Sequence, residues 1–312
     1  MPDAVCEEFP IADGGDGLID ALRRRLGGSL MAETVRGPRG ERRRACFLLL
    51  PDAVAVVEMA RASGLALLPS GRRDVMRSTS LGTGDLVRAA VRSGARTIVV
   101  GLGGSASSDG GAGLARALGA RLLDVREREI PDGAAGLPAL ARVDASEVRA
   151  LLHGIKVVAL SDVENPLCGA RGSARVFGPQ KGATRAQVRL LEDALRNWAW
   201  IVERDLGVRV EDAPGGGAAG GLGAGLLAFC GARIAPGADW VLEKLGAREA
   251  LSRSDLALTG EGRLDRTSFY GKAPLAFSRL ARKAHVPCVA VAGSLAPGVR
   301  AALKREGISR IV

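Results

Sequence analysis

Short apolar runs rich in β-branched residues alternate along this chain with stretches whose apolar residues recur at helical spacing. The runs are typical of buried strands in a largely parallel sheet, and the stretches are typical of amphipathic helices. The predicted strands are 45–50, 98–100, 120–125, 154–160, 256–258 and 286–292, and the main predicted helices are 18–26, 85–93, 185–205 and 275–284. Strands that alternate with helices of about ten residues predict an α/β protein.

A glycine-rich loop joins a predicted strand to a predicted helix within residues 96–119. The apolar run Ile98-Val99-Val100 is followed by Gly101-Leu-Gly-Gly-Ser-Ala-Ser-Ser-Asp-Gly-Gly-Ala-Gly113 and then by the helical pattern of 114–118. Backbone N–H groups and a helix N-terminus converge in such a unit and favour an anion, and glycines admit a phosphate close to the backbone. We therefore expect phosphate or a carboxylate to bind Gly103, Gly104, Ser105, Ser107, Ser108 and Gly110.

Two further glycine-rich stretches, 80–84 and 214–225, are predicted to precede helices in the same way. Lys181 lies in a loop rich in glycine and proline, and Lys272 follows a glycine. Both lysines suit a phosphate group. Glycine-rich helix starts, lysines and carboxylates together favour phosphoryl transfer, which needs little beyond positioning, anion stabilisation and Mg²⁺.

Carboxylates gather on loops that follow predicted strands, where α/β folds place ligands. The candidates for holding Mg²⁺ or for accepting the proton of a substrate hydroxyl are Asp162, Glu261 and Asp265. Asp13 and Asp16 bracket two glycines ahead of the helix 18–26. Three interpretations of these aspartates stay open: the pair binds a metal ion, the pair binds a sugar-like hydroxyl, or Asp16 simply caps the helix.

A dinucleotide-binding oxidoreductase is an alternative interpretation of the same loop. Gly101-x-Gly103-x-x-Ala106 follows a predicted strand, and Asp124 lies near the distance expected for a carboxylate that binds a ribose of NAD(P). However, the stretch 105–111 prolongs the loop where that motif needs a helix. A Walker A loop is absent, because Gly271-Lys272 is followed by Ala273.

The composition narrows the class of protein. The formal net charge of +10 suits anionic substrates, but the longest arginine runs, 23–25 and 42–44, lack the interleaved aromatic residues that stack on bases, so nucleic acid is not a predicted partner. The five cysteines form no CxxC pair, which argues against a zinc site or a disulfide framework. No apolar run approaches the ~20 residues of a transmembrane helix, and the first residues lack signal-peptide features. A cytoplasmic protein without a membrane partner is expected.

Seven motifs resemble, in order along almost the whole chain, those of the bacterial glycerate kinase family. They are Asp13-Gly-Gly-Asp-Gly17, Thr79-x-x-Gly-Thr-Gly84, Gly101-Leu-Gly-Gly-Ser-Ala106 with Asp109-Gly-Gly111, Asp162-Val-x-Asn-Pro-Leu167, Phe177-Gly-Pro-Gln-Lys-Gly182, Gly220-Gly-Leu-Gly223 and Thr259-Gly-Glu-Gly-Arg-Leu-Asp265. The motifs add Asp109 and Asn165 to the expected binding residues. The combination of these motifs is specific for this family.

The resemblance implies phosphorylation of D-glycerate by ATP and Mg²⁺, commonly to 2-phosphoglycerate. It also implies two α/β domains, a Rossmann- or flavodoxin-like domain built from residues 1–75 and 250–312 and a second domain inserted at 76–249, with the substrate in the cleft between them. We place the first boundary near residue 75 because the composition changes after Leu68-Pro-Ser-Gly71. In this scheme Lys181 neutralises phosphate charge, and Asp162 or Asp265 orients the glycerate hydroxyl or Mg²⁺. The metal ligands stay open.

The resemblance also has departures. Family members begin with a further strand, loop and helix and continue beyond the last residues of this chain, so we expect this chain to lack both segments. Asp16 replaces a more usual Glu, and Thr267 stands where a Gln is common. A truncated homologue that binds ligand without catalysis is therefore an alternative function. The oligomeric state, a homodimer included, stays open.

Overall fold

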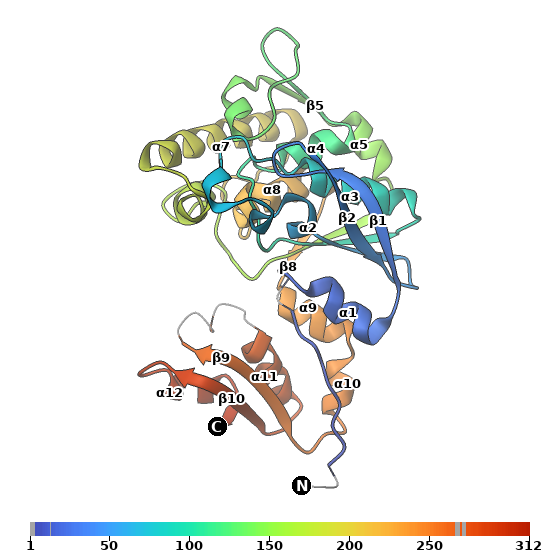
Figure 1. Cartoon of the computed structure of the whole chain (residues 1–312), viewed down its shortest axis with the longest axis vertical. Coiled ribbons are helices and arrows are strands. Elements are labelled where there is room, and N and C mark those ends of the chain that lie inside the picture. The colour runs from blue at the N-terminus through green and yellow to red at the C-terminus, as the bar shows by residue number, and fades with distance from the viewer. Residues whose placement is uncertain (1–3, 13, 266–268, 270–272) are drawn as a thin grey trace.

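The computed structural model describes residues 4–12, 14–265, 269 and 273–312 and shows an α/β protein with two main sheets (Figure 1). The larger sheet has six strands in the order β1-β2-β3-β4-β7-β8. Its first three strands are antiparallel neighbours, and β3, β4, β7 and β8 are parallel. The strands are β1 Ser29–Arg36, β2 Arg42–Leu49, β3 Val54–Glu58, β4 Thr97–Gly101, β7 Lys156–Leu160 and β8 Arg233–Ala235. The predicted α/β class is confirmed.

Helices cover both faces of the larger sheet, as its apolar parallel strands require. They are α1 Leu18–Leu26, α2 Ala60–Ser63, α3 Leu81–Arg92, α4 Ala112–Leu118, α5 Ser146–Leu151, α6 Ser173–Phe177, α7 Arg185–Leu206 and α8 Ala218–Cys230. A hairpin of β5 Arg121–Leu123 and β6 Arg142–Asp144 forms a separate small sheet. Within the described residues, no helix is both long enough and apolar enough to cross a membrane.

The second main sheet has three parallel strands in the order β11-β10-β9 and forms the lower body of Figure 1. Its strands are β9 Ala257–Leu264, β10 Cys288–Leu295 and β11 Ile308–Ile311, and its helices are α9 Gly237–Lys244, α10 Ala247–Leu251, α11 Ala273–Lys283 and α12 Arg300–Arg305. The N-terminal segment runs along this body, and Phe9 and Ile11 pack against its core.

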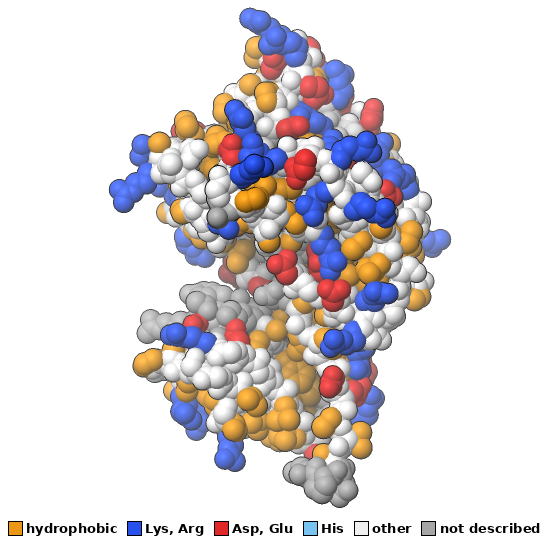
Figure 2. Space-filling model, in the orientation of Figure 1, with side chains coloured by type: hydrophobic (Ala, Val, Ile, Leu, Met, Phe, Trp, Pro, Cys, Tyr) orange, Lys and Arg blue, Asp and Glu red, His pale blue; other side chains and the backbone are white. Residues whose placement is uncertain are grey.

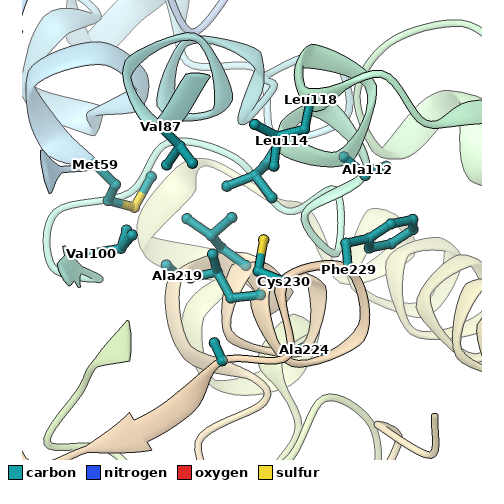
Figure 3. Packing of buried hydrophobic residues seen from close by; sticks show 14 of the residues in the cluster. Met59, Val87, Val100, Ala112, Leu114, Leu118, Ala219, Ala224, Phe229 and Cys230 are labelled. Atoms are coloured by element: carbon teal, nitrogen blue, oxygen red, sulfur yellow. The ribbon is translucent and has the colours of Figure 1, made fainter. Parts of the chain in front are cut away.

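The main hydrophobic core lies between β4, α3, α4 and α8 (Figure 3). Leu114 and Leu118 of α4 point toward Val87 of α3, and Phe229 and Cys230 of α8 lie on the opposite side. The apolar spacing that predicts these elements is thus used for burial.

The long helix predicted at 185–205 is confirmed as α7, and its start has a physical reason. Thr184 is in extended conformation, its hydroxyl accepts a hydrogen bond from the backbone N–H of Gln187 at 3.2 Å, and the Gln187 side chain accepts the N–H of Thr184 at 2.9 Å. This reciprocal capping satisfies two N–H groups that the helix leaves unpaired.

The glycine-rich stretch 80–84 is not a loop ahead of a helix, so that prediction is wrong. The helix α3 already begins at Leu81 and includes Gly82 and Gly84. A Cβ at position 82 would lie 1.8 Å from the carbonyl oxygen of Arg36, and one at position 84 would lie 2.6 Å from Cβ of Ala117. These glycines let α3 pack closely on β1 and α4 and are not required for an anion.

The strand pairing differs from the predicted division near residue 75. β3 pairs in parallel with β4 from Val54 opposite Thr97 to Glu58 opposite Gly101, and one core contains both Phe47 and Val100. Residues 29–58 therefore share a sheet with the segment predicted as the insertion, whereas β9–β11 form a sheet of their own. Parallel pairing between distant segments leaves no local pattern in the sequence. The domain boundaries themselves stay a prediction.

Candidate functional site

Two predicted motifs lie against each other where β4 ends and α1 begins. The N–H of Gly103 donates to the carbonyl oxygen of Gly14 at 3.3 Å. A Cβ at Gly103 would lie 2.3 Å from Cα of Gly15, and a Cβ at Gly101 would lie 2.3 Å from the carbonyl oxygen of Gly14. The glycines are thus needed because two backbones approach each other closely. Gly104, beyond this contact, is exposed.

The second half of the β4–α4 loop turns into the protein. Asp109 is fully buried, and its carboxylate accepts hydrogen bonds from the N–H of Ser80 at 2.8 Å, the Ser80 hydroxyl at 2.9 Å and the N–H of Gly113 at 3.2 Å. It therefore joins the starts of α3 and α4. Ser105, Ser107 and Ser108 are also buried, at 8%, 0% and 1% exposure. The predicted set is brought together, but only its first residues face solvent.

Lys181 contacts this loop from inside. Its side chain is 2% exposed, and Nζ donates to the carbonyl oxygen of Ser107 at 2.6 Å. Burial lowers the pKa of Lys181 to about 7, and the carboxylate of Asp109 opposes that shift. The structure therefore places the Lys181 ammonium group inside the protein, against the Ser107 peptide.

The third glycine-rich stretch serves the loop as a packing surface, contrary to its predicted role as an anion-binding helix start. A Cβ at Gly220 would lie 2.0 Å from the Ser107 carbonyl oxygen, and one at Gly221 would lie 2.8 Å from Cα of Gly110. The Gly220 carbonyl accepts the N–H of Gly110 at 3.0 Å. α8 thus holds the loop by backbone contact.

Two pockets meet at the start of α1. The larger, about 870 Å³, lies between β2, α2 and Gly104, and the smaller, about 630 Å³, lies between α1 and the β9–α11 region. Both are lined by Asp16, Gly17 and Asp20. Figure 2 shows the surface hollowed between the upper and lower bodies. Two ligands bound in these pockets would be neighbours.

A buried carboxylate that the sequence analysis missed fixes this wall. Glu58, at the end of β3, is 3% exposed. Its Oε1 accepts the N–H of Ile19 at 2.6 Å, and its Oε2 accepts Nε of Arg61 at 2.5 Å. Nη2 of Arg61 then donates to Asp20 at 3.1 Å. The available signal was a carboxylate ending the otherwise apolar strand Val54–Glu58.

The predicted carboxylates are spread over different surroundings. Glu261 is half-buried and lines the smaller pocket. Asp265, also half-buried, lies 3.5 Å from Nε of Arg263. Asp162 accepts the N–H of Gly237 at 2.9 Å and so caps α9, and Asn165 donates to the carbonyl oxygen of Arg171 at 2.7 Å. The predicted site residues Asp13 and Lys272 lie outside the described residues.

The loop does not have the dinucleotide-binding arrangement. β5 pairs with β6 and not with β4, and α4 begins only at Ala112. Asp124 accepts the backbone N–H groups of Arg126 and Arg128 in a turn, and the hydrogen bond from Arg128 lowers its pKa. Because Asp124 closes a hairpin away from the larger sheet, it does not stand where a ribose-binding carboxylate is needed.

Comparison with known proteins gives a consistent set of relatives. The model described as glycerate kinase family matches residues 1–312. A protein named glycerate kinase from Halalkalibacterium halodurans is 43% identical over 302 residues, which are 96% of this chain and 80% of that protein. A protein named glycerate 2-kinase from Escherichia coli K12 is 42% identical over 300 residues, 96% of this chain and 79% of that protein. A crystal structure described as glycerate kinase 2 from Salmonella typhimurium LT2 matches with a TM-score of 0.89 at 41% identity, covering 100% of this chain and 81% of that one.

Proposed function

The chain belongs to the glycerate kinase family and is a phosphotransferase, and from that premise we propose that it transfers the terminal phosphoryl group of ATP to the 2-hydroxyl of D-glycerate. The bond between the γ-phosphorus and its bridging oxygen breaks, a bond from the glycerate oxygen forms, and a carboxylate takes the hydroxyl proton. The products are ADP and 2-phosphoglycerate. Such a transfer needs two ligands held with their reacting oxygens in line.

The proposal rests on one observation, the wall that the two pockets share. Asp16, Gly17 and Asp20 border both cavities, between the end of the six-stranded sheet and the β9 region of the three-stranded sheet. One cavity can take the phosphoryl donor and the other the acceptor, with transfer across the start of α1. The exposed backbone of Gly104 lies at the same place and lines the larger cavity, where the missing side chain lets an anion approach closely.

The residues at this wall fit Mg²⁺. This ion is usually held by one or two carboxylates together with substrate phosphates. In the part of the chain that the structure describes, no group of three or more His, Cys, Asp and Glu residues could hold a metal alone. Asp16 is the carboxylate on the shared wall that would hold the ion together with ATP, and Asp20 is its neighbour. When bound, Mg²⁺ neutralises phosphate charge.

Within the smaller pocket we assign the proton acceptor to Glu261, because this half-buried carboxylate lines the cavity. Asp162 and Asp265 are second candidates for orienting the hydroxyl or the ion, since neither lines these two pockets. Lys181 and Asp109 support the reaction from inside by holding the loop that presents Gly104.

A coupled assay of ADP release with Mg-ATP tests the proposal, with D-glycerate and L-glycerate in parallel. We expect turnover with the D form, and phosphorus NMR distinguishes 2-phosphoglycerate from 3-phosphoglycerate. Glu261→Gln should lower kcat by at least ~10²-fold, a usual effect of removing a general base. Glu203→Gln, an exposed carboxylate on α7, is the matched control. Absence of turnover with D-glycerate would exclude the proposed reaction.

A further inference from the structure

The wall of the larger pocket combines arginines with apolar side chains. Four arginines, Arg43, Arg44, Arg61 and Arg73, line this cavity of about 870 Å³. Between them the surface is formed by small and apolar side chains such as Ala45 and Leu65. We call this cavity the arginine groove. Nothing in the sequence motifs points to it, because these arginines are scattered over β2, α2 and the segment after η1 (Leu65–Leu67).

Two of the arginines have charges that the protein leaves without a counterion. Within the described residues, neither Arg43 nor Arg44 forms an ion pair, and the buried Nε of Arg43 has no hydrogen-bond partner. Arg61, in contrast, is held by Glu58 and Asp20. The groove therefore combines the fixed guanidinium of Arg61 with the exposed side chain of Arg44, which is available to an anionic ligand.

We propose that the arginine groove is the site of the nucleoside triphosphate, with its base on the apolar surface near Leu65 and its phosphates among the arginines. Guanidinium groups are well matched to phosphate oxygens. The apolar surface suits a flat base. Glycerate, with three carbons, has no apolar part to cover that surface and would fill little of the cavity. The size and the mixed wall therefore favour a nucleotide over the acceptor.

The neighbouring pocket supports this orientation. The smaller cavity shares Asp16 and Asp20 with the groove and adds Arg24 and Glu261. A carboxylate of the acceptor suits Arg24, and its hydroxyl suits Glu261. The terminal phosphate in the groove then points toward Asp16, where a bound Mg²⁺ would offset the charge of the aspartate. This inference rests on the proposed phosphoryl transfer from ATP.

Steady-state kinetics of single variants test the assignment. Arg44 is exposed, so Arg44→Ala should fold normally. We expect the KM for ATP to rise about tenfold or more in Arg44→Ala, as the loss of one phosphate contact gives. The KM for D-glycerate should change less than twofold. Arg42→Ala is the matched control, because Arg42 lies on the same strand but lines a separate pocket of about 230 Å³ beside α3.

A second readout does not depend on turnover. Cys46 is half-buried and lines the groove, with its Sγ 3.4 Å from Nη1 of Arg61. In a Cys6→Ser background, which removes the exposed thiol, Cys46 should react with a thiol reagent such as iodoacetamide. We expect Mg-ATP or ADP to slow this modification at least fivefold, and D-glycerate alone to leave it unchanged.

The outcomes separate this inference from the proposed function. Turnover by the wild type, together with unchanged KM for ATP in Arg44→Ala and no protection of Cys46, overturns the groove as the nucleotide site while the kinase function stands. A rise in the KM for D-glycerate alone overturns it as well, because the anion in the groove is then the acceptor. Protection of Cys46 by ATP without any glycerate turnover supports the groove and contradicts the proposed acceptor.

Discussion

The carboxylate of Glu58 accepts a 2.6 Å hydrogen bond from the backbone N–H of Ile19, so the end of β3 caps the start of α1 from 39 positions away. The residue at the local cap position is Gly17, which has no side chain that could cap the helix. A negative charge beside a helix N-terminus stabilises the exposed N–H groups. The wall that both pockets share is thus attached to the parallel sheet through one buried side chain.

Glu58→Gln should destabilise the protein by about 2 kcal/mol, because the amide keeps an acceptor for Ile19 but loses the charge that pairs with Arg61. Arg61 is partly exposed, so water replaces some of the lost interaction. Urea unfolding monitored by circular dichroism measures the change.

The control for this prediction is Glu33→Gln. Glu33 forms an exposed pair with Arg92 at 3.2 Å, and exposed pairs contribute less than ~1 kcal/mol. We expect a change within ~0.5 kcal/mol. Equal effects of the two substitutions would contradict the special role of Glu58.

The candidate site is only partly readable in the sequence. The apolar run that ends at Val100 and the glycines after it place a loop at the end of a parallel strand, and that is where Gly103 and Gly104 lie. The sequence does not reveal whether a ligand or another backbone segment lies against each glycine. Gly103 and Gly220 are both needed because another backbone segment packs directly against them. A glycine allows a ligand or a backbone segment to approach equally closely.

The arginine groove could not be predicted from the sequence, for a different reason. Arg44 lies on β2 and Arg73 follows η1, and the tertiary fold alone brings them to one cavity. Because surface arginines are common and most are solvated, no local signal separates these from the rest. Burial of Lys181 is likewise a tertiary property, since lysines are rarely buried.

Lys181 should make stability depend on pH. Burial lowers its pKa from the ordinary lysine value of 10.5 to about 7 in the folded protein. Between these values the unfolded chain binds more protons than the folded one, so stability rises with pH from about 7 to about 10.5, by up to ~1.4 kcal/mol per pH unit. Lys181→Met removes this contribution and should flatten the profile of unfolding free energy measured in urea at pH 7.5, 8.5 and 9.5.

Lys283→Met is the control for the pH experiment, because Lys283 is exposed on α11. Its profile should run parallel to that of the wild type. Parallel profiles for Lys181→Met and the wild type would mean that Lys181 titrates alike in the folded and unfolded chain, which is incompatible with its burial against Ser107.

Gly220→Ala should destabilise the protein by more than ~3 kcal/mol and disturb the β4–α4 loop. The backbone φ of +73° is unfavourable for alanine, and the added Cβ would lie 2.0 Å from the Ser107 carbonyl oxygen. Gly231→Ala separates the two effects, since its φ is +56° and no atom lies within 4 Å of its Cβ. That control should lose only ~1 kcal/mol in thermal or urea unfolding.

Asp16→Asn tests the wall at which the two ligands are proposed to meet. Asp16 borders both pockets, and the hypothetical Cβ of Gly104 would lie 3.4 Å from its carboxylate. If Asp16 holds Mg²⁺ with ATP, the neutral amide binds the ion less well, so kcat should fall by at least ~10²-fold and the Mg²⁺ concentration for half-maximal rate should rise.

Asp193→Asn, on the exposed face of α7, is the matched control and should leave both quantities unchanged. A merely structural role of Asp16 predicts a different pattern: a lower melting temperature and a reduced kcat, with the Mg²⁺ dependence of the remaining activity as in the wild type. Because a lost metal ligand is compensated by more metal whereas a damaged fold is not, titration with Mg²⁺ distinguishes the two explanations within one variant.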